Sequence, residues 1–189
     1  MSSVVSSSGG LLTAEQFAAL PSSRRPQELI AGKVVDMPSP GTPHGQVIFN
    51  IAFLLKSYLK THDIGRAWGA ESGLITVRQP DSVRGMDAAF CSYGRWPKEE
   101  SKKGLMSVAP ELVIEVISPE DRWPRVLKKI TEYFDSGVLV VCTVDPELRT
   151  LQIHRDASSS TVLRNEDVFE VADILPGFSC RVSDLFEGV

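Results

Sequence analysis

The chain has few of the residues on which several classes of site depend. Its three cysteines, Cys91, Cys142 and Cys180, lie far apart and form no CxxC motif, and its three histidines have no metal-ligand spacing. This pattern argues against a zinc site and is typical of reduced cysteines in the core of a cytoplasmic protein. The sequence also shows no Ser/His/Asp set, no glycine-rich phosphate loop and no thiol nucleophile.

Long apolar runs are missing as well. No stretch is long enough to span a membrane, and the opening MSSVVSSSGG lacks the basic and apolar regions of a signal peptide. We therefore expect residues 1–10 to be a disordered tail and residues 11–189 to form a single domain with a sizeable core. The net charge of −4 argues against a protein that coats nucleic acid, although a local basic face is compatible with it.

The most informative stretch, residues 109–146, predicts a strand, a helix and a second strand. An apolar run rich in β-branched residues, 112–117, is typical of a buried strand. Pro124 suits the first turn of a helix that reaches about Ser136, and a second apolar strand follows at 139–144. A strand, a helix and a short return form a βαβ unit, so the two strands should be parallel, with the helix on one face.

A carboxylate interrupts the first of these strands. Burying Glu115 is costly unless it has a partner or binds a cation. On the helix, Lys129 and Tyr133 lie one turn apart at the edge of the apolar side, whereas Lys128 points nearly opposite, into solvent. Lys129 is therefore the lysine that can reach Glu115. The alternative is that Lys129 covers the sheet with its stem and keeps its ammonium in water.

A second acid lies in an upstream strand, 86–91. Taken alone, Asp87 would be a strand-start residue bonded to nearby backbone. Taken with Glu115 and Lys129, it indicates a site for a divalent cation, because Mg²⁺ prefers oxygen ligands and keeps several waters. Such a cation lowers the pKa of a bound water and polarises a phosphate, and Lys129 would orient that water or stabilise charge on the phosphate. This is the equipment for hydrolysing a phosphodiester.

The other segments predict further elements around this unit. Glu28, near the start of a hairpin, is expected to be solvated, and His44 is expected to cap the helix that it begins, with a place in the site as the alternative. The predicted elements are a short helix 14–20 with a capping box at Thr13 and Gln16, the hairpin 27–37 turning at 31–32, a helix 44–60, strands 65–70 and 74–78, a turn 79–85, a polar loop 92–107, strands 151–154, 161–163 and 168–171, and a last helical turn at 183–186.

An acid on one strand, a glutamate on the next and a nearby lysine resemble the PD-(D/E)xK nuclease superfamily. More closely, the chain resembles the Uma family of putative bacterial restriction-type endonucleases. The resemblance covers residues 12–187 in the same order, and it is carried by residues 28–34, His44, 86–90, 110–119, Lys129 with Tyr133, 137–138, 144–146 and 175–178.

The resemblance implies an α/β, restriction-endonuclease-like fold, with a mixed β-sheet flanked by helices and an N-terminal helix and hairpin. It implies that Asp87 and Glu115 bind Mg²⁺ or Mn²⁺ and that Glu28 is an additional acid near the metal. The lysine that usually lies two residues after the glutamate is replaced here by Ile117, and its role passes to Lys129. The residues expected to support the site are Tyr133, His44 and Arg125.

The favoured function is a metal-dependent endonuclease that hydrolyses phosphodiester bonds in DNA. A homodimer would suit it, because cutting both strands calls for two sites. The alternatives are a non-catalytic binding or assembly module with a nuclease fold, and a nuclease that acts on RNA or single strands. Three departures from the family bear on activity: Met86 stands for a proline, Arg125 for a frequent aspartate, and Val141-Cys142 for an aromatic pair.

Overall fold

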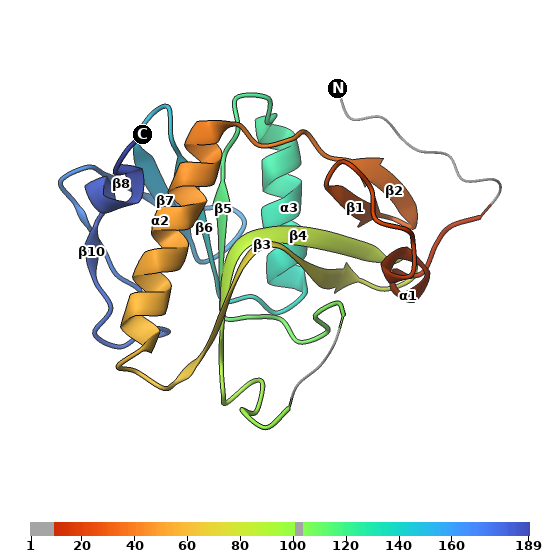
Figure 1. Cartoon of the computed structure of the whole chain (residues 1–189), viewed down its shortest axis with the longest axis horizontal. Helices are drawn as coiled ribbons and strands as arrows, with labels where there is room; N and C mark the ends of the chain where they lie inside the picture. The colour runs from red at the N-terminus through yellow and green to blue at the C-terminus, as the bar shows by residue number, and fades with distance from the viewer. Residues whose placement is uncertain (1–9, 101–103) are drawn as a thin grey trace.

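A computed structural model describes residues 10–100 and 104–189, so the predicted tail lies outside the described residues except for Gly10, which is exposed. The fold is mixed α/β, with a large twisted sheet between two long helices (Figure 1). The elements are α1 Ala14–Ala18, β1 Gln27–Ile30, β2 Lys33–Asp36, α2 Thr42–Leu59, β3 Gly65–Val77, β4 Ser82–Ser92, β5 Leu112–Val116, α3 Trp123–Asp135, β6 Val140–Asp145, β7 Thr150–His154, β8 Ser160–Arg164, β9 Val168–Phe169, β10 Cys180–Arg181 and the 3₁₀ helix η1 Val182–Phe186.

The sheet has eight strands in the order β2-β1-β4-β5-β6-β7-β8, with β3 paired to β4 outside this path. Only the β5–β6 pair is parallel among the strand pairs of the described residues, and its register sets Glu115 beside Thr143. The helix between these two strands is α3, so the predicted βαβ unit is confirmed. The predicted strand 151–154 is confirmed as β7, which pairs with β6 in the antiparallel direction.

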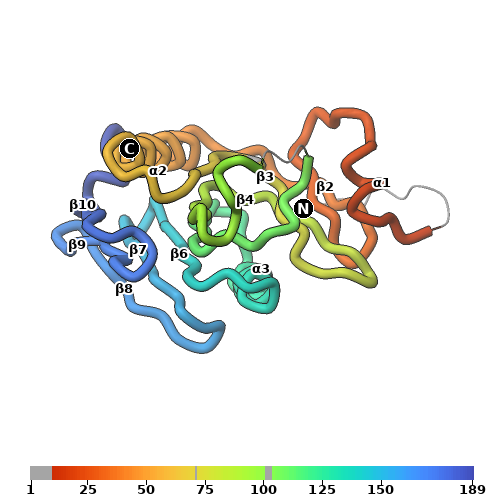
Figure 2. Tube along the Cα trace, turned by 90° about the horizontal axis from the view of Figure 1, so that it is seen from below, coloured from red at the N-terminus to blue at the C-terminus, as the bar shows by residue number. Residues whose placement is uncertain are grey.

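The two long helices cover opposite faces of the sheet (Figure 2). On one face, α2 buries Val47, Ile51 and Leu55 against alternate residues of β5, β6 and the C-terminal segment. On the other face, α3 buries Ile130 and Tyr133. Successive residues of a strand point to opposite faces, so β5 contributes to both cores and Glu115, two residues after Val113, points toward α3.

The N-terminal elements match their predictions closely. Thr13 and Gln16 form the capping box of α1, each satisfying a backbone N–H of the other. In the β1–β2 hairpin, Ala31 and Gly32 both have positive φ, 49° and 76°, which is the backbone of a tight hairpin turn. Helix α2 begins two residues before the predicted start, with Pro43 in its first turn.

Two predictions around β3 and β4 are wrong. Residues 65–77 form one strand rather than two, because a register shift between Gly69 and Ser72 absorbs the irregularity while the pairing with β4 continues. The predicted turn 79–85 ends early: β4 begins at Ser82, and Val83 pairs with both β1 and β3. The strand therefore runs on both sides of Asp87, which is not a strand-start residue.

Two smaller differences concern the loop 92–107 and the C-terminal part of the chain. The loop 92–107 is not wholly solvated, because Trp96 and Met106 are buried and Met106 forms a bridge with Leu74; residues 101–103 of this prediction lie outside the described residues. The predicted strand 168–171 is shorter and pairs with β10 in a separate sheet. All three cysteines are buried and free, as predicted. Among the described helices, none has the length and apolar character needed to cross a membrane.

Candidate active site

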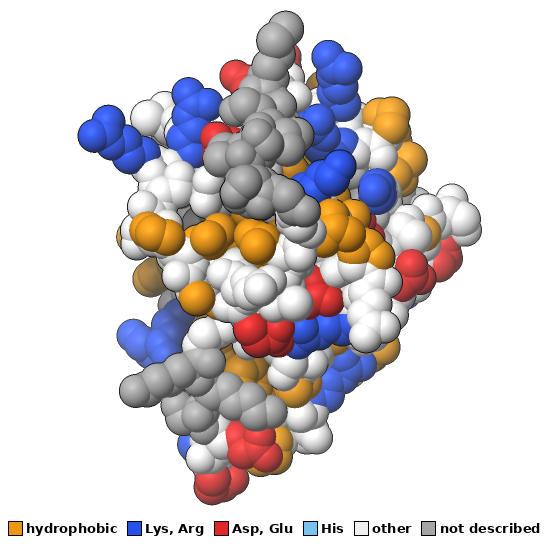
Figure 3. Space-filling view, turned by 90° about the vertical axis from the view of Figure 1, so that its right-hand side faces the viewer, with side chains coloured by type: hydrophobic (Ala, Val, Ile, Leu, Met, Phe, Trp, Pro, Cys, Tyr) orange, Lys and Arg blue, Asp and Glu red, His pale blue; other side chains and the backbone are white. Residues whose placement is uncertain are grey.

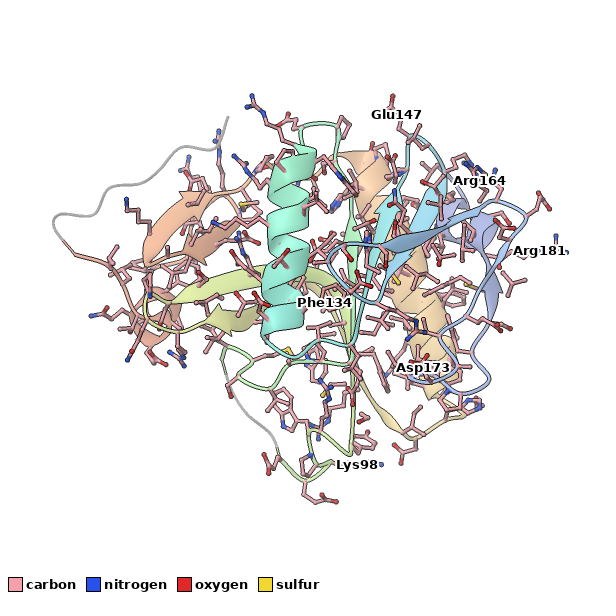
Figure 4. The ribbon with its side chains drawn as sticks, turned by 180° about the vertical axis from the view of Figure 1, so that it is seen from behind. Lys98, Phe134, Glu147, Arg164, Asp173 and Arg181 are labelled. Carbon is pink, nitrogen blue, oxygen red and sulfur yellow. The ribbon has the colours of Figure 1, made fainter. Side chains whose placement is uncertain are left out.

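Six of the seven side chains singled out in the sequence line one cavity of about 110 Å³. The cavity lies where the β1–β2 hairpin, the beginnings of α2 and α3, and strands β4 and β5 meet. Figure 4 shows the hairpin and α3 on the same side of the molecule. The six are Glu28, His44, Asp87, Glu115, Arg125 and Lys129. The seventh, Tyr133, donates a hydrogen bond from its hydroxyl to Glu115. The expected convergence is therefore present in the structure.

Glu115 is held by α3 on both of its oxygens. Lys129 Nζ donates to Oε2 over 2.7 Å, and the Tyr133 hydroxyl donates to Oε1 over 2.6 Å. The lysine and the tyrosine are one helical turn apart, so a single face of α3 supplies both donors. Lys128 is exposed, as the helical projection predicts. The alternative of a lysine with its ammonium in water is wrong for Lys129, which also donates to the Gly85 carbonyl over 2.9 Å.

Asp87 faces Glu115 across neighbouring strands. The β4–β5 ladder pairs Ala88 with Ile114, and the next positions along the two strands are Asp87 and Glu115. Asp87 Oδ2 accepts a hydrogen bond from the Val116 N–H over 2.8 Å. The carboxylate thus takes the place of a backbone acceptor just beyond the last β4–β5 pair, Ala88 with Ile114. Both acids are on the α3 side of the sheet. Asp87 lies two residues before Ala89, and Glu115 lies two residues after Val113, and both Ala89 and Val113 belong to the core under α3.

His44 lies in the site, and the prediction that it caps α2 is wrong. The N-cap is Gly41, and His44 Nε2 lies 3.4 Å from Asp87 Oδ2. The Nδ1 atom of His44 is buried and has no hydrogen-bond partner among the described residues. Burial lowers the pKa of His44, but Asp87 outweighs this effect, so the pKa lies above its ordinary value.

Glu28 is buried rather than solvated, which corrects the expectation from its place near the strand start. Its Oε1 accepts the Gly85 N–H over 3.1 Å and lies 3.3 Å from Lys129 Nζ, and its Oε2 accepts from Arg84 over 2.8 Å. Burial raises the pKa of Glu28, but Lys129 and Arg84 more than compensate, so the net shift is downward. Both oxygens are occupied by protein donors, so Glu28 holds Lys129 in place.

Sequence reasoning missed a buried ion pair between Arg84, which lines the cavity, and Glu132. Arg84 donates to the two oxygens of Glu132 over 2.7 and 2.9 Å in a bidentate pair, while it also bonds Glu28. The polar sequence around Arg84 suggested a turn instead of a strand. A signal for Glu132 was available: it lies three residues after Lys129 and so shares its edge of α3.

The site holds more negative than positive charge. Four carboxylates line the cavity, those of Glu28, Asp87, Glu115 and Asp121, and three cations, Arg84, Arg125 and Lys129, which leaves a formal charge of −1 when all are ionised and His44 is neutral. Burial, followed by repulsion from Asp87, raises the pKa of Glu115 to about 7 although Lys129 opposes the shift. Burial lowers the pKa of Lys129, but Glu115 and Glu28 outweigh it and hold that pKa well above its usual value.

The donor set fits a divalent cation that keeps waters. A cation bound to Asp87 and Glu115 would neutralise the excess charge and relieve their repulsion, and carboxylate oxygens are the ligands that Mg²⁺ prefers. Within the described ranges, no group of three or more His, Cys, Asp or Glu side chains is placed to enclose an ion. Asp87 and Glu115 would supply two carboxylates, and water the remaining ligands.

The mixed sheet, the two covering helices and the acidic pair with its lysine define a nuclease-like α/β fold. The family model described as Uma2, putative restriction endonuclease, matches residues 14–183, and the chain belongs to this family. A solved structure, a putative nuclease of the DUF820 family from Anabaena variabilis, superposes with a TM-score of 0.77. That protein is 24% identical, and the match covers 93% of this chain and 98% of the other. No curated protein matches the chain.

Proposed function

We propose that the protein is a Mg²⁺-dependent endonuclease that hydrolyses phosphodiester bonds in DNA. The observation that carries the proposal is the meeting of Asp87 and Glu115 on adjacent strands of one cavity, with Lys129 Nζ 2.7 Å from the glutamate. The excess of negative charge in the lining and the repulsion between these two carboxylates support a divalent cation at this place. Membership of a family described as putative restriction endonucleases supports nucleic acid as the substrate.

The roles of the residues follow from their contacts. A bound Mg²⁺ would polarise the phosphate and lower the pKa of a water that attacks it. Lys129 keeps its proton because two carboxylates surround it, so it can stabilise charge on the phosphate or orient the water. Tyr133 fixes the orientation of Glu115, and Glu28 fixes that of Lys129. The Val116 N–H and His44 hold Asp87.

The proposal is tested by cleavage and by metal binding in the same set of variants. Wild type should cut DNA when Mg²⁺ or Mn²⁺ is present and should stop when the metal is chelated. The metal should also raise the melting temperature, because it binds only the folded protein. Asp87→Asn should lose both effects while it keeps the fold, since it changes the charge of a group without removing apolar volume.

Asp173→Asn is the matched control, because Asp173 is half exposed and its side chain forms an ion pair with Arg155, away from the cavity. It should keep both the cleavage and the metal-induced rise in melting temperature. If wild type shows the rise but cuts no DNA under any condition, the site binds metal without catalysing hydrolysis. If neither effect appears, the metal ligands proposed here are wrong.

A further inference from the structure

Three exposed arginines lie within two residues, in the chain, of residues that line the cavity, on two segments that are distant in the sequence. Arg24 and Arg25 precede Pro26, which lines the cavity at the start of β1. Arg122 follows Asp121, which lines the cavity at the start of α3. The fold thus brings the two segments that carry these arginines to the cavity, one on the hairpin side and one on the α3 side. Figure 3 shows Lys and Arg side chains on both sides of the upper half of the face that carries the hairpin.

The side chains of these three arginines have no hydrogen-bond or ion-pair partner in the described part of the chain. Other arginines are tied to carboxylates, among them Arg78, Arg84, Arg95 and Arg155. A guanidinium without an internal partner can bind an external anion without breaking an ion pair. It also presents a planar set of donors that matches two phosphate oxygens.

The charge of the cavity makes such residues necessary for a polyanionic substrate. The chain carries −4 overall and the cavity itself holds an excess of carboxylates, so the field at the metal ligands repels DNA before a cation is bound. Positive charge at the edge of the cavity offsets this repulsion where the DNA backbone must approach. Local charge, rather than the net charge, then guides the encounter.

We propose that Arg24, Arg25 and Arg122 form an arginine rim that binds the DNA phosphates on either side of the one that is cut. The proposal rests on the proposed function, because it takes the DNA backbone as the ligand. Phosphate contacts position the backbone without reading its sequence, so the rim would set affinity and register and leave base recognition to other residues.

The test measures binding in the absence of cleavage. A fluorescent duplex is titrated with wild type in the presence of EDTA over a series of salt concentrations. The triple variant Arg24→Gln/Arg25→Gln/Arg122→Gln should bind more weakly, and the slope of log K against log salt should fall by about 2 to 3, since each phosphate contact contributes about 0.9. Its melting temperature should stay unchanged, because all three side chains are exposed.

Arg164→Gln is the matched control. Arg164 is also exposed, and its side chain has no hydrogen-bond or ion-pair partner among the described residues, but it lies on β8 at the far edge of the sheet from the hairpin (Figure 4). This variant should keep the affinity and the salt slope of wild type. Equal losses in the triple variant and in Arg164→Gln, or no loss in the triple variant, would overturn the rim.

This experiment separates the rim from the catalytic proposal. Binding in EDTA does not depend on hydrolysis, so the rim can be supported in a protein that cuts nothing. Conversely, a wild type that cuts DNA while the triple variant binds with an unchanged salt slope would refute the rim and leave the nuclease intact. Absence of measurable duplex binding by wild type would also refute the rim.

Discussion

At the scale of single residues, the two adjacent lysines of α3 provide the sharpest test of the chemistry. Lys129 contacts Glu115 and Glu28 inside the cavity, whereas Lys128 is exposed. Lys129→Ala should lower the cleavage rate by roughly a hundredfold or more, the effect of removing one positioned electrostatic group. Lys128→Ala should cost only a modest, salt-sensitive part of DNA affinity. Equal losses in rates measured at saturating DNA would mean that the helix acts only as a basic surface.

Glu115 gives the site a pH dependence whose sign can be stated. Its pKa is raised from 4.5 to about 7, so the folded state binds more protons than the unfolded state between these values. The stabilisation from this proton is complete below the unfolded pKa and is lost as pH rises through about 7. Denaturation of the metal-free protein should therefore give a lower free energy of unfolding at about pH 8 than at about pH 5.5.

Glu115→Gln should reduce this decline, and His44, whose pKa is also raised, should account for part of what remains. Metal binding should show the opposite trend. Because the ligand must be deprotonated, the rise in melting temperature on adding Mg²⁺ should be larger at about pH 8 than at about pH 6. A metal effect that is independent of pH over this range would show that Glu115 is not a ligand.

Residues of the candidate site differ in how far the sequence could reveal them. The sequence could reveal Glu115, Asp87 and Lys129. An acid within an apolar strand, or a lysine at the edge of an apolar helix face, is costly to bury unless it has a partner. Glu28 and His44 lie at the starts of elements, where capping and solvation are the common roles. Only the tertiary contacts show that Glu28 forms an ion pair with Arg84 and that His44 lies against Asp87.

At the scale of elements, the ion pairs of Arg84 attach α3 to β4 and β1. Removing one partner of a buried ion pair leaves an uncompensated charge, so Arg84→Ala should lower the free energy of unfolding by about 3 to 5 kcal/mol. Arg78 is the comparison, because it also bonds two carboxylates but is half exposed. Arg78→Ala should cost about 1 kcal/mol or less. Urea denaturation of both variants measures the difference, and similar losses would mean that burial of Arg84 carries no special cost.

The elements that were mispredicted share a physical cause. Strand β4 has a polar beginning, so its sequence favours a turn, yet pairing with β1 on one side and β3 on the other satisfies its backbone. Strand β3 contains glycines and a register shift, which break the alternation that predicts a strand. By contrast, β5, α3 and β6 are apolar or strongly amphipathic, and they match their predicted bounds within one residue. The bounds of β3 and β4 depend instead on pairing between strands that are distant in the sequence, and such pairing leaves no local pattern.

At the scale of the whole molecule, each chain contributes one Asp87–Glu115 pair as the proposed metal site. If it cleaves DNA as proposed, such a site would cut one strand at a time, and cutting a duplex across both strands would require a second site in the opposite orientation. A homodimer would provide it, since a two-fold axis matches the symmetry of the two strands. The oligomeric state should therefore decide the product of the reaction.

We expect the product from supercoiled plasmid to depend on enzyme concentration. At low concentration nicked circles should accumulate, because single chains act independently. As the concentration rises and two chains meet, linear DNA should form directly, and sedimentation should show a dimer over the same range. A mixture of wild type with excess Asp87→Asn should shift the product back to nicked circles, because most dimers then hold one active site. Linear product without a nicked intermediate from a protein that sediments as a monomer would contradict this expectation.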